Sequence, residues 1–504
     1  MQDLQKTLVR NKIVILIIIL ATVLRFSYLD KFPFAVNVDE AAKGYNAYSL
    51  LKIGKSFRGL TWPLYFTDYS NQQPSHVILY NYIIIPSVAL FGLSPFAIRL
   101  PAAIIGTLTI LIIYLLSFEL FKSRSLAHLS ALFLAISPWH IFISRMAIEP
   151  ITYPFLFLLG WYFAQKALKN KKYLYISTFV FGLCLYSYQS ALLTVPLFLL
   201  AYTVINFKQL HSNKLISLFS LFVFILVVSP LVFIFLTNPF ILGHFYNSSA
   251  NQTSLNIRIT EFVKNYIGQL LTLHIFYPLT ILILAMVGFW IVLKKRSNIS
   301  IKLIAFVTMM SIIPAAATNL GYVVSATRTF PIVGNIEILS ALGFLQIKDR
   351  LTKSKVMLFT FCLISMAFMF INIVALTSTR EFYFSIGFKE AVSYINQVKD
   401  GYDNIIVNYP ANQPFAYFLF YGKYPPEKFL NEKVKRVYLK NRVYPFELVH
   451  KFDKYIFCQD GWCENPKGKS LYLFEPYNYD TAHYKEVLQI YFFKQKVMTI
   501  AQKR

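Results

Sequence analysis

Two neighbouring carboxylates, Asp39 and Glu40, open the segment DEAAKGYNAYSLLKIGK and are the residues best suited to chemistry. A positioned carboxylate acts as a general base when it takes a proton from an attacking hydroxyl or amine. The same pair also suits a helix start, where Asp39 would be the N-cap and Glu40 would favour the positive first turn. Gly54 would end that helix. We keep both interpretations, since one carboxylate pair can serve structure and catalysis together.

Acidic residues are scarce in this chain, so each one carries information. The 504 residues are 56% hydrophobic and 14% charged, whereas a soluble enzyme has roughly 25% charged residues. The apolar runs are longer than the strands of a membrane β-barrel. The composition therefore excludes a soluble multidomain enzyme and a disordered chain, and it predicts an α-helical polytopic membrane protein of about 11–13 transmembrane helices.

The basic residues indicate topology. There are 49 Lys and Arg against 23 Asp and Glu, and the net charge is +26. Much of this excess lies in short clusters between apolar runs, as the positive-inside rule expects of cytoplasmic loops. No basic groove motif or zinc-finger spacing supports nucleic-acid binding. The clusters that we place in the cytoplasm are 166–172, 208–214, 294–296 and 348–355.

Twelve apolar runs are candidate spans, and one of them must be interrupted. Twelve full crossings from a cytoplasmic N-terminus would leave residues 381–504 inside, whereas the charge clusters place them outside. We expect the break at Ser137-Pro138, because proline removes a backbone donor and clashes with the preceding turn. The runs are 13–29, 76–92, 97–120, 126–145, 150–167, 173–190, 191–207, 215–236, 275–293, 301–318, 330–347 and 355–376.

Residues 381–504 predict a small extracytoplasmic α/β domain beside a membrane domain of residues 1–380. Residues 388–398 have helical spacing, and 403–409 form a β-branched run typical of a strand. Outside the cytoplasm, Cys458 and Cys463 would form a local disulfide, the alternative being two unpaired thiols.

Five blocks of sequence resemble the polytopic GT-C glycosyltransferases that use polyprenyl-phosphate sugars, namely glycosyltransferase family 39, the protein mannosyltransferase and aminoarabinose transferase group. Each block is moderately specific, and their order and spacing together strengthen the resemblance. The blocks lie at 39–55, 85–116, 132–150 (LFLAISPWHIFISRMAIEP), 182–200 (GLCLYSYQSALLTVPLFLL) and 327–344 (TRTFPIVGNIEILSALGF).

The resemblance implies a membrane glycosyltransferase of the plasma membrane that moves one sugar, with inversion, from a polyprenyl-phosphate donor to an extracytoplasmic acceptor. Asp39 would be the general base, with Glu40 as the other member of the acidic pair. The acceptor would be a protein, a lipid or a glycan. The implied phosphate-binding residues are Arg328 first, then Arg99 and Arg145, each of which could equally be a structural arginine inside the helix bundle. The implied cavity residues are Glu149, Tyr45, Tyr188, Gln189, Asp68 and His76, the alternatives being an interfacial tyrosine for Tyr188 and a polar helix start for His76.

The sequence also departs from that family. Relatives carry an acid, a lysine and a Pro-Pro-Leu-Tyr motif where this chain has SNQQPSHVILY, at 70–80. They also have an arginine where this chain has Leu192. The chain thus lacks family residues implied for a divalent metal site and for one contact to the donor phosphate. Asp68 and His76 are the candidates to take their place.

Two other functions fit parts of the pattern. A transporter or flippase of lipid-linked sugars would place its ionisable residues inside the spans and often shows an internal repeat, whereas here the acids gather in a loop. A degenerate family member could instead act as a binding subunit, which the altered 70–80 segment favours.

Overall fold

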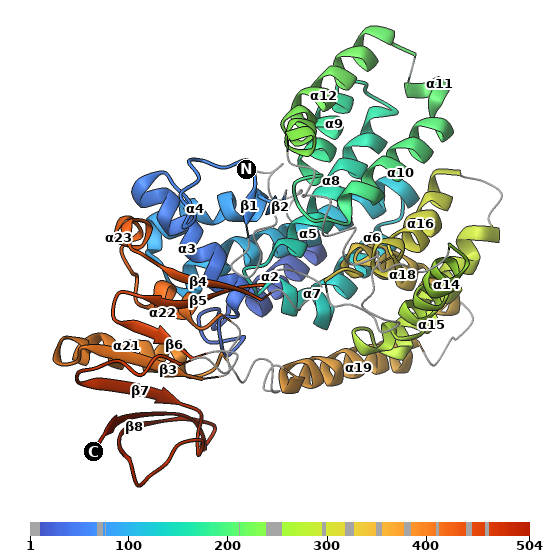
Figure 1. Cartoon of the computed structure of the whole chain (residues 1–504). Coiled ribbons are helices and arrows are strands. Elements are labelled where there is room, and N and C mark those ends of the chain that lie inside the picture. Colours follow the sequence, from blue (N-terminus) through green and yellow to red (C-terminus); the bar gives the residue numbers. More distant parts are fainter. Residues whose placement is uncertain are drawn as a thin grey trace, which may run out of the picture. The chain divides into compact units, whose positions relative to one another are not determined.

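The protein is described by a computed structural model (Figure 1). The described residues are 11–67, 74–75, 77–210, 212–237, 255–294, 299–317, 327–348, 355–376, 385–409, 413–439, 446–458 and 463–504.

These residues form two compact units that interleave along the chain. The first comprises 1–27, 76–80 and 102–373, and the second comprises 28–75, 81–101 and 374–504. By its contacts, the first loop with its acidic pair groups with residues 81–101 and 374–504 in the second unit. The predicted domain division at residue 380 stays a prediction.

The first unit is helical. Its helices are α2 (Lys12–Phe26), most of α5 (Pro95–Phe121), α6 (Arg124–Ala135), α7 (Pro138–Ile143), α8 (Thr152–Ala167), α9 (Tyr173–Cys184), α10 (Ala191–Ile205), α11 (Phe207–Leu210), α12 (Lys214–Thr237), α14 (Leu255–Leu271), α15 (Leu279–Lys294), α16 (Ile299–Met310), α17 (Ile313–Ala316), α18 (Asn335–Lys348) and α19 (Lys355–Leu376), with 3₁₀ turns η1 (Glu149–Ile151), η3 (Leu273–Ile275) and η4 (Phe330–Ile332).

Helices α5 and α12 are long and apolar enough to cross a membrane, and several shorter helices are as apolar. Most of the large apolar side chains of helix α12 are exposed. Leu236 is 79% exposed and Leu215 is 64% exposed. A helix that is apolar on all sides is stable only in lipid or in a protein core. Exposed rings and aliphatic chains of this kind are typical of a helix that crosses a membrane.

The predicted break at Ser137-Pro138 is confirmed, since α6 ends at Ala135 and α7 begins at Pro138. Elsewhere in this unit, α15 and α18 approach so closely that their backbones touch. A Cβ added at Gly288 would lie 1.9 Å from the Leu339 carbonyl oxygen, and one at Gly343 would lie 2.0 Å from that of Leu284. Small residues at such crossings are the usual means by which membrane helices pack.

The second unit combines the first loop with an α/β domain (Figure 1). Its helices are α3 (Val38–Ile53), most of α4 (Leu79–Phe91), α21 (Phe388–Val398), α22 (Phe415–Tyr421) and α23 (Pro426–Asn431), with the 3₁₀ turn η5 (Lys399–Gly401). Its strands are β1 (Phe66–Thr67), β2 (Pro74–Ser75), β3 (Asn404–Asn408), β4 (Lys435–Leu439), β5 (Phe446–Phe452), β6 (Tyr455–Phe457), β7 (Ser470–Phe474), β8 (Tyr484–Phe492) and β9 (Gln495–Lys503).

Seven of these strands form one mixed sheet in the order β4-β5-β6-β3-β7-β9-β8. Strand β3 is central and parallel to both neighbours, with Ile406 opposite Ile456 on one side and Tyr472 on the other. Its buried run Asn404–Val407 fits a strand covered on both faces. The helix predicted at 388–398 and the strand predicted at 403–409 are confirmed, the strand being shorter at both ends.

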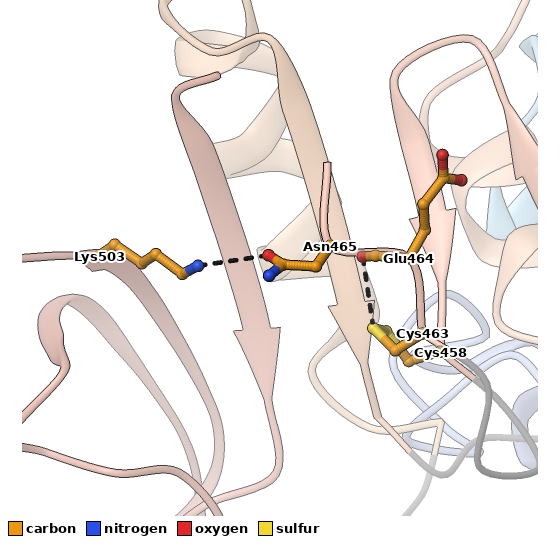
Figure 2. The surroundings of a disulfide bond; sticks show 5 residues. All are labelled: Cys458, Cys463, Glu464, Asn465 and Lys503. Carbon is orange, nitrogen blue, oxygen red and sulfur yellow. Dashed lines mark hydrogen bonds between the residues drawn. A yellow bond between two sulfur atoms is a disulfide. The ribbon is translucent and has the colours of Figure 1, made fainter. Parts of the chain in front are cut away.

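Cys458 and Cys463 form a disulfide just after β6, with their Cα atoms 4.4 Å apart (Figure 2). Two residues further on, Asn465 accepts a hydrogen bond of 3.3 Å from the Lys503 ammonium of β9. The disulfide thus closes a short loop beside the sheet. The other two cysteines, Cys184 and Cys362, are buried thiols.

We expect alkylation of the denatured, non-reduced protein to label two cysteines, and four after reduction. Replacing Cys458 and Cys463 by serine should lower the free energy of unfolding by about 2 kcal/mol, the chain-entropy value for so short a loop. Mass spectrometry counts the labels, and thermal unfolding measures the loss. Four labels without reduction would contradict the disulfide.

Candidate active site

Helix α3 begins with a capping box, and its N-cap differs from the predicted Asp39. The N-cap is Asn37, whose side-chain oxygen accepts from the Glu40 amide at 2.8 Å, while the Glu40 carboxylate accepts from the Asn37 amide at 3.1 Å. The predicted cap, Asp39, is instead the second residue of the helix. Its carboxylate is therefore not used in closing the first turn.

Glu40 is fully buried and forms a two-point ion pair with Arg99. The Arg99 Nε donates to Oε1 at 2.9 Å, and a terminal nitrogen donates to Oε2 at 3.1 Å. The remaining donors of this guanidinium reach the carbonyl oxygens of Leu29, Pro33 and Ala35. One arginine thus fixes both the start of α3 and the loop before it.

This geometry favours structural roles for both partners. Their side chains are 1% and 0% exposed, and all five Arg99 donors have protein acceptors. Such a buried pair suits a positioning role. The catalytic role of Glu40 and the phosphate contact of Arg99, which the resemblance implies, stay predictions.

Asp39 differs from its neighbour in exposure and in partners. Its side chain is exposed at the N-terminal turn of α3, and no described residue forms a hydrogen bond or ion pair with it. A carboxylate in the first turn of a helix lies beside the unpaired backbone amides and the positive end of the helix dipole. Within the second unit, the arrangement therefore fixes the backbone of Asp39 and leaves its oxygens open to a substrate.

The rest of α3 packs against the C-terminal domain. The Tyr45 hydroxyl, predicted to line a substrate cavity, is instead buried and donates to the Tyr424 carbonyl oxygen at 2.9 Å. Helix α22 lies along the same helix (Figure 1). Burial raises the pKa of its Tyr417, as do the neighbouring Tyr421 and the carboxylate of Asp39. The C-terminal domain is thus part of the support of Asp39.

We expect Gly44→Ala to loosen this contact. A Cβ at Gly44 would lie 2.7 Å from the Phe420 ring and 2.8 Å from Ile98, closer than packed carbon atoms allow. Overpacking of this kind costs about 1–3 kcal/mol. Thermal unfolding of the purified chain measures the loss against Lys52→Ala, on the exposed side of α3. Equal stability of the two variants would contradict the tight packing of α3 on α22.

The other predicted residues belong to the first unit. Arg145 is buried and donates to the carbonyl oxygens of Leu24 at 2.8 Å and Ser27 at 2.5 Å, at the end of α2. Arg25 does the same for α6, through Leu134 and Ala135. The two arginines therefore neutralise the unpaired carbonyls at two helix ends, which favours a structural role for Arg145 in place of the predicted phosphate contact.

Arg328 and the YSYQS segment lie side by side. The Ser190 hydroxyl donates to the Arg328 carbonyl oxygen at 3.4 Å, and Tyr188 and Gln189 immediately precede it in a turn before α10. All three predicted side chains are half-buried. Glu149 is also half-buried and begins η1, where its carbonyl accepts from the Thr152 hydroxyl at 2.7 Å. These residues remain candidates for substrate contacts.

Two predicted residues, Asp68 and His76, lie outside the described residues. Within the described ranges, no group of three or more His, Cys, Asp or Glu side chains is placed to hold a metal ion.

The structure shows three separate polar contacts that were not predicted from the sequence, and they involve Asn37, His140 and Glu337. Asn37 was detectable, because Asn-x-x-Glu before an amphipathic run has the spacing of a capping box. His140 Nδ1 lies 2.8 Å from the Arg25 guanidinium. Glu337 accepts from the Tyr277 hydroxyl at 2.9 Å and from the Gly334 amide at 2.7 Å. The contacts of His140 with Arg25 and of Glu337 with Tyr277 leave no local pattern in the sequence, because each joins segments far apart in the chain.

Comparison with known proteins gives a family segment and a fold. Residues 75–234, roughly a third of the chain, match the family model of dolichyl-phosphate-mannose-protein mannosyltransferase. No curated protein sequence matches the chain.

Solved structures that share the fold include two of ArnT and one of an oligosaccharyltransferase. ArnT from Cupriavidus metallidurans bound to undecaprenyl phosphate has a TM-score of 0.56 at 12% identity, over 97% of this chain and 98% of that one. Its apo form has a TM-score of 0.56 at 13% identity, over 97% of each chain. The oligosaccharyltransferase of Archaeoglobus fulgidus, in complex with Zn and sulfate, has a TM-score of 0.51 at 12% identity, over 81% of this chain and 61% of that one. The predicted fold, helical with a C-terminal sheet domain, is confirmed in these main features.

Proposed function

We propose that this chain, which has the fold of the GT-C glycosyltransferases and resembles the mannosyltransferase and aminoarabinose transferase group, is a membrane glycosyltransferase that takes its sugar from a polyprenyl-phosphate donor. The observation that carries the proposal is the difference between the two acids of the first loop. Glu40 is buried against Arg99, whereas Asp39 is exposed on the helix that this pair fixes. Such an arrangement suits a reactive carboxylate on a rigid support.

In the proposed reaction, Asp39 is the general base. It accepts the proton of the acceptor hydroxyl or amine while the oxygen or nitrogen lone pair forms a bond to the anomeric carbon. The bond from that carbon to the lipid phosphate oxygen breaks, and its electrons leave with the polyprenyl phosphate. Attack opposite the leaving group inverts the anomeric configuration. The phosphate gains negative charge, which a nearby cation would stabilise.

Arg328 is our candidate for that cation. Its half-buried side chain comes from the TRTFP segment beside Ser190, the block in which the family resemblance implies the phosphate-binding arginine. We expect Arg328→Ala to weaken donor binding about tenfold or more, as loss of a charged hydrogen bond costs roughly 1.5–3 kcal/mol. Titration with a polyprenyl-phosphate sugar measures the affinity, with Arg328→Lys as the variant that keeps the charge. Unchanged affinity in Arg328→Ala would remove this residue from the phosphate site.

We further propose a multi-pass protein of the plasma membrane, with about 11–13 spans and with Asp39 and residues 381–504 outside the cytoplasm. The exposed apolar surface of α12 and the positive clusters support the spans and their orientation. The disulfide in the C-terminal domain supports the exterior location, because disulfides persist in oxidising compartments.

The direct test is sugar transfer by the purified chain in lipid nanodiscs. Polyprenyl-phosphate sugars are supplied singly, with an extract of surface glycans, lipids and proteins as acceptors, and mass spectrometry detects one added sugar. We expect one donor to support transfer, with polyprenyl phosphate released in equal amount. Release without transfer would indicate a hydrolase, and neither product with any donor would contradict the proposal.

A further inference from the structure

The hairpin of β8 and β9 ends in a turn whose residues are unsuited to it. Phe492 pairs with Gln495, so Phe493 and Lys494 form a two-residue loop, and both have positive φ, 44° and 68°. Turns of this kind favour Asn and Gly, because a side chain in the left-handed region costs roughly 1–2 kcal/mol. Local conformational preference thus does not explain this choice of residues, which points to another role.

The turn is also rich in exposed aromatic rings. Phe493 is 71% exposed and Tyr491 is 58% exposed. We call residues 491–494 the aromatic tip. Exposure of large aromatic rings to water is unfavourable. Their transfer to a membrane interface, where aromatic residues are enriched, is favourable.

The aromatic tip contacts the segment that follows α2. The Phe34 ring lies 5.2 Å from that of Phe492 and 5.4 Å from that of Phe493, and Phe32 packs on Phe34 at 5.4 Å. Tyr28, the second residue after α2, is 72% exposed. The tip is therefore anchored within a few residues of the end of that helix.

One helix that is long and apolar enough to cross a membrane begins beside the tip, within the second unit. Helix α5, long and apolar enough to span, begins at Pro95, and Pro95 and Phe492 line the same cavity. The aromatic tip and the first residue of α5 therefore meet at one cavity of the second unit.

That cavity has a volume of about 240 Å³ and lies wholly within the second unit. Two lysines, Lys31 and Lys389, and two acids, Asp30 and Glu390, line it. No described residue forms a hydrogen bond or ion pair with these four exposed side chains, although Lys31 lies over the Tyr28 ring at 5.8 Å. Charges of both signs are thus open to one ligand.

We propose that the aromatic tip and this cavity bind a membrane phospholipid with a zwitterionic headgroup. The rings of Tyr491 and Phe493 lie in the interfacial layer, the phosphate meets Lys31 and Lys389, and the headgroup amine meets Asp30 and Glu390. A phosphoethanolamine headgroup carries this pair of charges. The site holds the C-terminal domain at the bilayer, and it requires a membrane-embedded chain but not sugar transfer.

The first test replaces Phe493 by the photoreactive p-benzoyl-phenylalanine in the full chain, in nanodiscs that contain phosphatidylethanolamine. The control places the same residue at Lys467, which is exposed before β7, at the other end of the sheet from the tip. We expect phospholipid adducts at position 493 and not at 467 by mass spectrometry. Equal lipid adducts at both positions would overturn the proposal. So would a crosslink from position 493 to another protein, in place of a lipid adduct, when the same variant is irradiated in cells.

The second test concerns the headgroup. We expect Lys31→Gln/Lys389→Gln to lower the retention of phosphatidylethanolamine in native mass spectrometry roughly tenfold, the sum of two exposed charge contacts. Lys485→Gln, exposed on β8, is the matched control and should retain the lipid. Equal retention by the double variant would overturn the assignment of the headgroup to the cavity. Sugar transfer measured on the same samples separates a failure here from a failure of the proposed reaction.

Discussion

Asp39→Asn should lower kcat for sugar transfer by about 10²–10⁴-fold, the range that a general base contributes. The amide has the size of the carboxylate but cannot accept the acceptor's proton. Asp39 is exposed, and no described residue forms a hydrogen bond or ion pair with it, so the substitution should leave the fold intact. Steady-state transfer in nanodiscs, with thermal unfolding of the same sample, measures both effects.

The matched control for this variant is Asp400→Asn, an exposed aspartate of η5 in the same unit. It should transfer sugar at the rate of the unmodified chain. Donor affinity should also be unchanged in Asp39→Asn, because a base for the acceptor does not meet the phosphate. Full transfer by Asp39→Asn would remove the base assignment, whereas loss of transfer together with unfolding would point to a structural role.

Glu40→Gln should destabilise the protein by about 3–5 kcal/mol, the usual loss when one partner is removed from a buried ion pair. Glutamine can still complete the capping box, so the loss would arise from Arg99, left buried without a counter-charge. The melting temperature of the purified chain and its protease resistance measure the change. Activity should fall because the support of Asp39 loosens, even though Asp39 itself is intact.

The double variant Glu40→Gln/Arg99→Met separates charge from positioning. It removes the unpaired cation but also the hydrogen bonds to Leu29, Pro33 and Ala35. We therefore expect stability to return in part while transfer stays low. Normal stability and activity in Glu40→Gln alone would contradict the positioning role of the pair.

Local patterns predicted the elements well because their causes are local. Pro138 lacks the backbone donor that would continue α6, and the helical spacing at 388–398 gives that helix one apolar face. The exposed Asp39 could also be predicted, because acids are rare enough in this chain to be noticed.

Long-range partners could not be predicted in the same way. Nothing near Arg99 in the sequence shows that its carboxylate lies 59 residues earlier, and nothing near Arg145 points to the end of α2. An arginine in an apolar helix has the same local signature whether it binds a phosphate, a carboxylate or a carbonyl. The structure separates these cases by showing which acceptors each guanidinium meets.

The contact between Tyr45 and Tyr424 has a consequence for biogenesis. The two residues are 379 positions apart, so a ribosome adding about 5–20 residues per second makes the second some 20 to 80 s after the first. Throughout that interval the helix that carries Asp39 exists without the domain against which it packs. The nascent chain would therefore enter the membrane with an immature reactive helix, and competence for transfer would arise only when the domain that contains Tyr424 has folded.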